Sequence, residues 1–177
     1  MVSKRYILEF LKDLRHNNSK EWMDANRTRY HKAKECWIEE AALILKRLAQ
    51  HDTAFAHVTP KATLSRINNN RRFHPDKPVY KDYFNCDPDK TQKDVSVLHL
   101  SVGPGTSFIG GGLWRPQKEA LDQYRAAIDY NGAFFREIVE APAVQQFYGG
   151  LSMDEQKLKT APMGYHKNHP QIDLLRY

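Results

Sequence analysis

The hydrophobic periodicity changes several times along the chain, and the order of these changes limits the folds that it can adopt. From Lys4 to Arg15, apolar residues recur at intervals of three and four, which predicts an amphipathic helix. Ser19 stands where an N-cap is expected, and a long helix is predicted from there to about Gln50. Residues 51–93 show no sustained period and are interrupted by prolines, so we expect a long ordered loop of functional use.

The second half of the chain begins with alternating apolar residues. Val95–Leu100 and Ser107–Ile109 flank a Gly-Pro-Gly turn at 103–105, which predicts a hairpin, and we expect it at the centre of a sheet covered by helices on at least one face. Asn131-Gly132 is a good helix stop. Helices are predicted at 117–130, 133–140 and 143–148, a strand or extended segment at 156–161, and a last strand at 172–175.

This order of elements predicts an α+β fold with a mostly antiparallel sheet, an N-terminal helical segment and helices packed on the sheet. No repeat or linker divides the chain, so a single domain over residues 1–177 is expected. Cys36 falls in a predicted helix and Cys86 in a predicted loop. Neither has a second ligand at metal-binding spacing, so both are expected to be reduced structural thiols.

Charge and hydropathy narrow the possible partners. The net charge is +6, the pI is about 9.3 and the mean hydropathy is -0.71. No apolar stretch approaches the length of about 20 residues that a bilayer requires, and the N-terminus has no signal-peptide core, so we expect a cytoplasmic protein with no membrane partner. The positive charge suggests a polyanion, a phosphorylated small molecule or an anionic surface as partner, although an ordinary solvated surface explains it equally.

Candidate ligand-binding side chains are most concentrated in residues 66–81, which we call the basic loop. It holds five Lys and Arg residues and one carboxylate on a chain too rich in proline to be helical. Arg66, Arg72 and Lys77 are candidate anion ligands, because guanidinium and ammonium groups on one loop can converge on one anion. Alternatively, these arginines pair with carboxylates and brace the loop. Tyr80 is a candidate general acid, or else a packed tyrosine with one hydrogen bond.

A run of three glycines, residues 110–112, stands between a predicted strand and a predicted helix. Gly111 and Gly112 are candidate ligand-binding positions, because glycine lets a ligand approach the backbone closely. The run is neither a G-x-G-x-x-G motif nor a Walker loop, so nucleotide binding of those kinds is not expected. A bulge that lets the neighbouring Trp114 pack explains the glycines equally well.

The last candidates lie in residues 158–170. Lys159 is a candidate anion contact, and His169 is a candidate proton-transfer group or a structural histidine. His166 and His169 are three residues apart, but Gly164 and Pro170 argue against the helix that would bring both to one metal. No metal and no cofactor are therefore expected.

At these three places the chain resembles the bacterial family known as domain of unknown function 2461. Members carry an R-x-x-R-D-x-R-F-x-x-x-K-x-x-Y signature, a G-G-G-x-x-x-P turn and an L-K-x-x-P-x-G-Y segment followed by H-P. The matching residues are Arg66, Arg72, Phe73, Lys77, Tyr80, Gly110, Gly111, Gly112, Pro116, Leu158, Lys159, Pro162, Gly164, Tyr165, His169 and Pro170. The N-terminal Phe10-Leu11, Asn17-Asn18, Glu21-Trp22, Asn26-Arg27 and Tyr30 are similar too. The resemblance implies a bacterial cytosolic protein and no assigned activity.

The chain departs from the family signature at two positions. Asn69 stands where the family has its second Arg, and Asn70 where it has Asp. An amide cannot ionise, so Asn70 cannot serve as a base in place of that Asp. Members also tend to run beyond the position of Tyr177, so either that tail is dispensable or the chain is a trimmed variant.

Two functions of different classes fit these observations. In the first, the protein binds a small phosphate- or carboxylate-bearing ligand in a basic pocket, with or without catalysis. In the second, it binds nucleic acid along the basic loop and the basic first half of the long helix, with Trp22 or Tyr30 stacking on bases. Acidic residues interspersed in that helix favour the small ligand. The helix cations are Lys20, Arg27, Arg29, Lys32 and Lys34.

Overall fold

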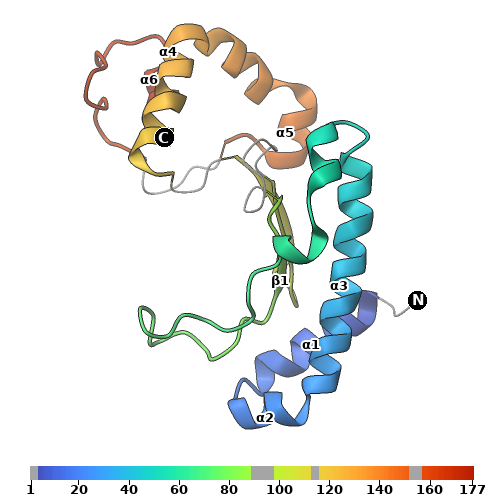
Figure 1. Ribbon diagram of the computed structural model, residues 1–177. Coiled ribbons are helices and arrows are strands. Elements are labelled where there is room, and N and C mark those ends of the chain that lie inside the picture. The colour runs from blue at the N-terminus through green and yellow to red at the C-terminus, as the bar shows by residue number, and fades with distance from the viewer. Residues whose placement is uncertain (1–3, 89–97, 113–115, 152–156) are drawn as a thin grey trace. The chain divides into compact units, whose positions relative to one another are not determined.

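The computed structural model describes residues 4–88, 98–112, 116–151 and 157–177 (Figure 1). These residues group into two compact units, unit 1 (residues 1–113) and unit 2 (residues 114–177), each of which is described by itself. The single domain expected from the sequence stays a prediction. The α+β class is confirmed: helices lead the chain, and one antiparallel sheet of three strands follows.

Helix α1 (Lys4–His16) provides the first face of the core of unit 1. Ile7, Phe10, Leu11 and Leu14 are all buried, at the intervals of three and four that predicted the helix. They pack against α3 (Arg27–Leu48), which contributes Tyr30, Ala33, Trp37 and Ala41 to the same cluster.

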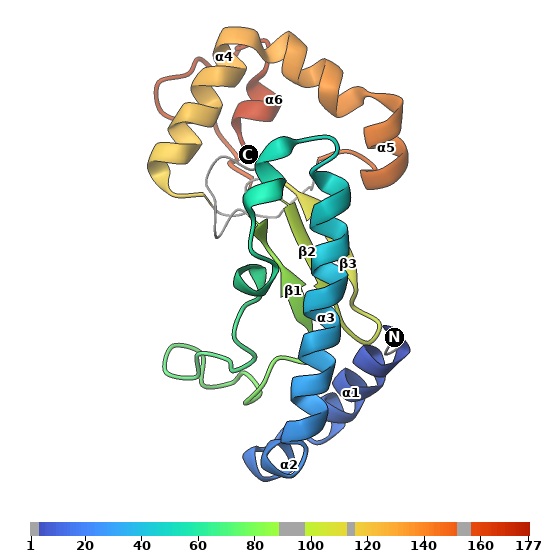
Figure 2. The same cartoon turned by 45° about the vertical axis from the view of Figure 1, so that its right-hand side comes forward.

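The long helix predicted after Ser19 is two helices, so that prediction was wrong in part. Ser19 does cap α2 (Lys20–Ala25), because its hydroxyl accepts from the backbone N–H of Trp22 at 3.1 Å. The chain then leaves helical geometry at Asn26, whose side-chain amide donates to the carbonyl of Trp22 at 2.9 Å. Asparagine competes for backbone groups in this way, and here it ends α2 and starts α3 at a new angle (Figure 2).

The sheet has the order β1-β2-β3, with β1 at Phe84–Cys86, β2 at Leu98–Val102 and β3 at Phe108–Gly111. The predicted hairpin is confirmed as β2 and β3, although Val95–Val97 lie outside the described residues. Strand β1 was not predicted, since it lies in the stretch taken as irregular. Cys86 is therefore a strand residue rather than a loop residue, and it is buried and free, as is Cys36.

The two faces of the sheet differ in chemistry. Paired residues share a face, so Phe84, Cys86, Leu100 and Val102 line one face, which packs against the α1–α3 core. Figure 1 shows α3 along one side of the strands and the basic loop extending away from their lower end. The expectation that the hairpin is central holds only for β2, because β3 is an edge strand whose residues are mostly exposed.

The basic loop is attached to the helices by the side chain of Asn18. Its Nδ2 donates to the carbonyl of Tyr80 at 2.9 Å, and its Oδ1 accepts from the N–H of Tyr80 at 2.8 Å. The N–H of Lys81 donates to the carbonyl of Ile67 at 2.7 Å, and Asn68 pairs with Tyr80 in an antiparallel bridge. One asparagine at the α1–α2 junction thus holds the end of a loop 62 residues away in sequence.

Unit 2 contains α4 (Lys118–Glu140), α5 (Pro142–Tyr148) and α6 (Ile172–Leu175). The predicted stop at Asn131-Gly132 is a kink rather than an end, because only Asn131 leaves helical geometry. Gly132 has a packing role there, since a Cβ at this position would stand 2.4 Å from Cγ of Gln171.

The strand predicted at 172–175 was wrong, because this segment forms α6 and is held along one face of α4. Leu174 and Leu175 pack with Ile128, and Arg125 donates to the carbonyls of Leu175 and Tyr177 at 2.9 and 3.1 Å. Residues 157–161 form no strand either, and Gln156 lies outside the described residues.

Arg136 extends this attachment by donating to Gln171 and to the carboxylate of Asp173. Burial raises the pKa of Asp173, but the hydrogen bond and charge of Arg136 outweigh that effect, so this pKa lies below its ordinary value.

No helix in the described ranges combines the length and the apolar character needed to cross a bilayer.

Replacing Asn18 with Ala should destabilise the protein by about 1–3 kcal/mol, because the N–H and carbonyl of Tyr80 lose their partners in a half-buried place. Asn17→Ala is the matched control, since its side chain makes one exposed bond, to the carbonyl of Asp13. Urea denaturation measures both free energies of unfolding. Equal and small losses would show that Asn18 does not hold the loop.

Candidate functional site

The cations predicted as anion ligands are exposed. Arg66, Arg72 and Lys77 all present their side chains to solvent, and in the described part of the chain none lies within ion-pair distance of a carboxylate. The interpretation of Arg66 and Arg72 as braces paired to carboxylates therefore finds no support among these residues. Arg72 instead lies over the ring of Phe73, 5.8 Å from its centroid, and Phe73 is 71% exposed.

The two asparagines that depart from the family signature shape the basic loop. Asn69 donates its side-chain amide to the carbonyl of Pro78 at 2.9 Å, and its N–H to the carbonyl of Val79 at 3.1 Å. The carbonyl of Asn70 accepts from Phe73 and His74 in a turn. Both residues thus organise the backbone between the two halves of the loop.

Tyr80, the candidate general acid, is only 4% exposed and belongs to the α1–α3 core. This burial favours the packed-tyrosine alternative that the sequence left open.

Gly111 and Gly112 lie in and just after β3, and both are exposed. Gly112 has a φ of +97°, and a Cβ at this position would meet no atom within 4 Å, so its glycine serves the backbone conformation rather than a close approach. Trp114, which the bulge alternative involves, lies outside the described residues.

The other two candidates, Lys159 and His169, belong to unit 2, so the predicted set is divided between the two units. Lys159 is exposed. His169 is held at both ring nitrogens: Nε2 lies 2.8 Å from Oδ1 of Asp129, and Nδ1 accepts from the N–H of Gln171 at 3.0 Å. These contacts favour the structural interpretation of His169.

A polar network that the sequence analysis missed lies on the face of the sheet opposite Phe84, Cys86, Leu100 and Val102. Asp87 follows β1 and is 2% exposed. Its Oδ2 accepts from Nδ2 of Asn85, and its Oδ1 is in ion-pair contact with Nδ1 of His99 on β2. Asn85 also bonds Ser65, donating to its hydroxyl at 3.1 Å and accepting from its N–H at 3.0 Å. The network therefore reaches from β2 to the residue that precedes Arg66.

The imidazole of His99 is positioned but accessible. Its ring stacks on Phe108 with centroids 5.2 Å apart, and its side chain is 42% exposed. Gly110 pairs with His99 across β2 and β3, and a Cβ on Gly110 would meet only Phe108, at 4.0 Å. The missing side chain leaves space beside the imidazole on this face.

The buried carboxylate also affects its neighbours. Burial raises the pKa of the Tyr83 phenol, and the negative charges of Asp82 and Asp87 raise it further. The pKa of the Cys86 thiol is raised by burial as well, against the lowering effect of a hydrogen bond from Thr63. Both groups therefore stay protonated at neutral pH, and Tyr83 is available as a hydrogen-bond donor.

A weak signal for this network was present in the sequence. In the run Leu-His-Leu-Ser-Val over 98–102, His99 and Ser101 alternate with apolar residues, which assigns both to the polar face of a strand. Asp87 could not be paired with His99 in this way, because the pairing depends on the register of β1, which was not predicted.

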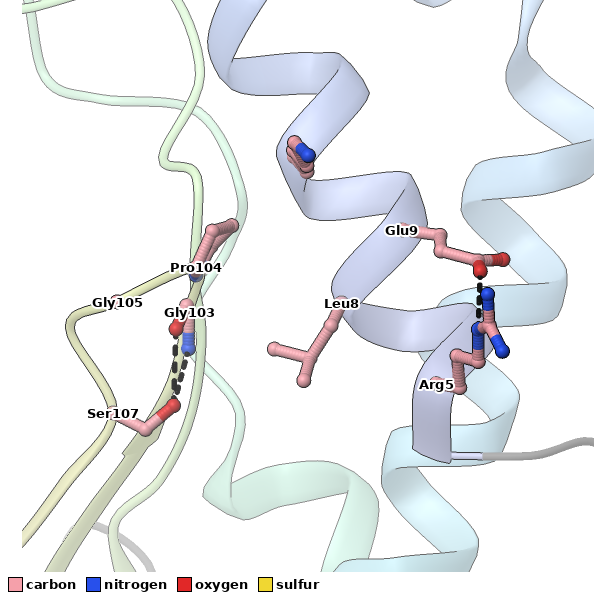
Figure 3. A pocket seen from close by; sticks show the side chains of 8 residues that line it. Arg5, Leu8, Glu9, Gly103, Pro104, Gly105 and Ser107 are labelled. Atoms are coloured by element: carbon pink, nitrogen blue, oxygen red, sulfur yellow. Dashed lines mark hydrogen bonds and ion pairs between the residues drawn. The ribbon is translucent and has the colours of Figure 1, made fainter.

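A hollow of about 280 Å³ opens between α1 and the turn at 103–107 (Figure 3). Among its polar groups, Arg5 pairs with Glu9 at 2.7 Å, and the Ser107 hydroxyl bonds the N–H and the carbonyl of Gly103. None of the predicted site residues lines it. The hollow is therefore a weaker candidate than the basic loop.

Across the described ranges, no group of three or more His, Cys, Asp or Glu residues is arranged to hold a metal ion.

Comparison with known protein families identifies the family of the chain. The family described as conserved hypothetical protein (DUF2461) matches residues 6–177, and the chain belongs to this family. The resemblance inferred from the three motifs is thus confirmed. Comparisons with curated proteins and with solved structures gave no match.

Asn85→Ala should cost at least about 2 kcal/mol of stability, because each buried polar group left unsatisfied costs about 1–3 kcal/mol and a charged one costs more. The variant removes a donor from Asp87 and an acceptor from the N–H of Ser65. Asn69→Ala, the same change at an exposed amide, is the control. Thermal and chemical denaturation measure both; a loss at Asn85 no larger than at Asn69 would contradict the network.

Proposed function

We propose that the protein binds a small anionic ligand, carrying phosphate or carboxylate, through the basic loop. The observation that carries this proposal is the absence of carboxylate partners for Arg66, Arg72 and Lys77 in the described part of the chain. Five other arginines of the described residues pair with a carboxylate. The pairs are Arg5–Glu9, Arg15–Asp82, Arg27–Asp24, Arg29–Asp13 and Arg136–Asp173.

The chemistry of these side chains supports an anion as the ligand. A guanidinium group engages phosphate or carboxylate with two parallel hydrogen bonds, and an ammonium group adds a point charge. Exposed cations keep their hydration in the free protein, so they stay available to exchange water for an anion. The backbone bonds within the basic loop hold these side chains on one short, organised segment.

Hydrogen bonds attach the base of the loop to the sheet. Ser65 is hydrogen-bonded to Asn85, and Asn85 is hydrogen-bonded to Asp87. Arg66 is therefore the next residue in sequence after a member of this network. Lys81 donates its Nζ to the carbonyl of Arg66 at 2.8 Å, which ties the two ends of the loop together. These bonds fix the backbone on either side of the loop, so its base is held rigidly against the sheet.

Arg72→Lys should weaken binding of phosphate by about 1.5–3 kcal/mol, the range for hydrogen bonds to charged groups, and leave the fold intact. Isothermal titration calorimetry with inorganic phosphate and a melting curve measure the two effects. The control is Arg27→Lys, because Arg27 already pairs with Asp24 at 2.8 Å. A lower melting temperature with unchanged phosphate binding would show that Arg72 is a brace and not a ligand.

Nucleic-acid binding is the second candidate, and one observation favours it: Phe73 is exposed among cations, as in surfaces on which bases stack. The helical part of that hypothesis is weaker. Tyr30 is buried, and Arg27 and Arg29 are paired with Asp24 and Asp13.

For nucleic acid we expect only weak, non-specific binding that falls steeply as salt rises, because neutralised phosphates release counterions. Fluorescence anisotropy with a labelled single strand measures the affinity. Sub-micromolar binding at physiological salt, lost in Phe73→Ala and kept in the equally exposed aromatic variant Phe147→Ala, would reverse the order of the two candidates.

A further inference from the structure

Phe73 is a large apolar side chain of the basic loop that the core does not bury. Ile67 and Tyr80, near the two ends of the loop, are 7% and 4% exposed and belong to the α1–α3 core. Phe73 is 71% exposed and lies in the middle of the loop, which extends away from the strands of unit 1 in both Figure 1 and Figure 2. The ends of the loop are therefore anchored, and the ring between them is open to solvent.

Hydrogen bonds within the loop fix the turn that carries Phe73. The N–H groups of Phe73 and His74 both donate to the carbonyl of Asn70, at 3.3 and 3.1 Å. Nη2 of Arg71 donates to the carbonyl of Pro75 at 3.3 Å, across the same turn. Because these bonds close the turn from within, the folded backbone itself sets the exposed position of the ring.

Arg72 places a guanidinium group beside this ring. Its Cζ lies 5.8 Å from the ring centroid of Phe73, and no carboxylate of the described residues is within ion-pair distance of it. The contact of Arg29 with Trp22 in the same unit is different. Arg29 also pairs with Asp13 at 2.6 Å, and Trp22 is partly buried. The Arg72–Phe73 pair thus combines an exposed ring with a guanidinium that has no acidic partner among the described residues.

Neither member of this pair indicates a ligand by itself. Single exposed apolar side chains are common on protein surfaces, and an exposed contact between a cation and a ring is weak. In direct contact, however, the two side chains offer both groups that recognise a planar ring joined to an anion. The ring of Phe73 is a stacking surface, and the guanidinium of Arg72 can bind phosphate with two hydrogen bonds.

We propose that the anion bound by the basic loop is a free nucleoside phosphate, with its base stacked on Phe73 and its phosphate held by Arg72. The inference rests on the proposed function, because the anion and the guanidinium are the same. A nucleotide joins a planar base to a phosphate through a ribose, so one molecule meets both side chains. Every base has a π-face, so we expect little preference among bases. This recognition uses side chains, and it needs neither of the glycine-rich motifs that the chain lacks.

The first experiment compares ligands that differ only in the base. Isothermal titration calorimetry of the full chain with AMP, CMP and ribose 5-phosphate measures the three affinities. Stacking of a base on an aromatic side chain corresponds to about 5–150-fold in affinity, so both nucleotides should bind more tightly than ribose 5-phosphate by a factor in this range.

The second experiment removes the ring and keeps an apolar side chain. Phe73→Leu should weaken AMP binding by about 5–150-fold and leave ribose 5-phosphate binding unchanged, because the sugar phosphate makes no stack. Arg72→Lys should weaken both. The control is Phe147→Leu, the same change at a phenylalanine of unit 2 that is 82% exposed, and it should change neither affinity. Melting curves verify that all three variants are folded.

A third measurement separates a free nucleotide from a nucleotide within a strand. Fluorescence anisotropy with a labelled single strand of oligodeoxyadenylate, at physiological salt, gives the affinity for the polymer. We expect AMP to compete with the strand and to bind at least as tightly. A strand that binds much more tightly than AMP, and loses this affinity in Phe73→Leu, would replace the free nucleotide by nucleic acid and overturn the inference.

The remaining outcomes separate the inference from the proposed function. If the wild-type protein binds neither inorganic phosphate nor any of the phosphorylated ligands, both fail. If inorganic phosphate binds and Arg72→Lys weakens it, but AMP binds no more tightly than ribose 5-phosphate, only the inference is overturned. AMP binding that Phe73→Leu leaves intact, or that Phe147→Leu weakens equally, also overturns the inference alone.

Discussion

The buried carboxylate of Asp87 requires hydrogen-bonding or charged partners from the elements around it. A charge removed from water destabilises the fold unless it has partners, and here Asn85 of β1 donates to it and His99 of β2 is in ion-pair contact with it. The N–H of Asp87 also donates to the carbonyl of Thr63 at 3.1 Å, so the segment before the basic loop is held too. Through this one group, strand pairing, the base of the loop and an accessible imidazole depend on each other.

The parts of the fold that were predictable are those with a strong local pattern. The apolar spacing in α1, the capping hydroxyl of Ser19 and the Gly-Pro-Gly turn between β2 and β3 each act within a few residues. The errors arose where distant contacts decide the conformation. Strand β1 exists because β2 pairs with it, and α6 is a helix because side chains of α4 bind its carbonyls and bury its leucines.

The candidate site also has parts that were predictable from local sequence and parts that depend on distant contacts. The basic loop was evident from its composition, and the structure shows three of its cations, Arg66, Arg72 and Lys77, exposed and without acidic partners in the described residues. Asp87 and His99 are 12 positions apart with undescribed residues between them, and only the register of β1 against β2 makes them neighbours. Tyr80 was proposed as a site residue because it matches a family motif. A motif match does not tell whether a side chain contacts a ligand or packs in the core, and the side chain of Tyr80 packs in the core.

The hydrogen bonds within the basic loop reduce the conformational entropy that the loop would lose when a ligand binds. Asn69 links its two halves, Asn70 and His74 form successive turns, and Asn18 fastens one end to the helices. A loop without these bonds would lose backbone freedom when a partner arrived, at roughly 1–2 kcal/mol for each residue ordered. Because folding has already ordered this segment, a partner has to restrain only the ends of the long cationic side chains, and association and release can both be fast.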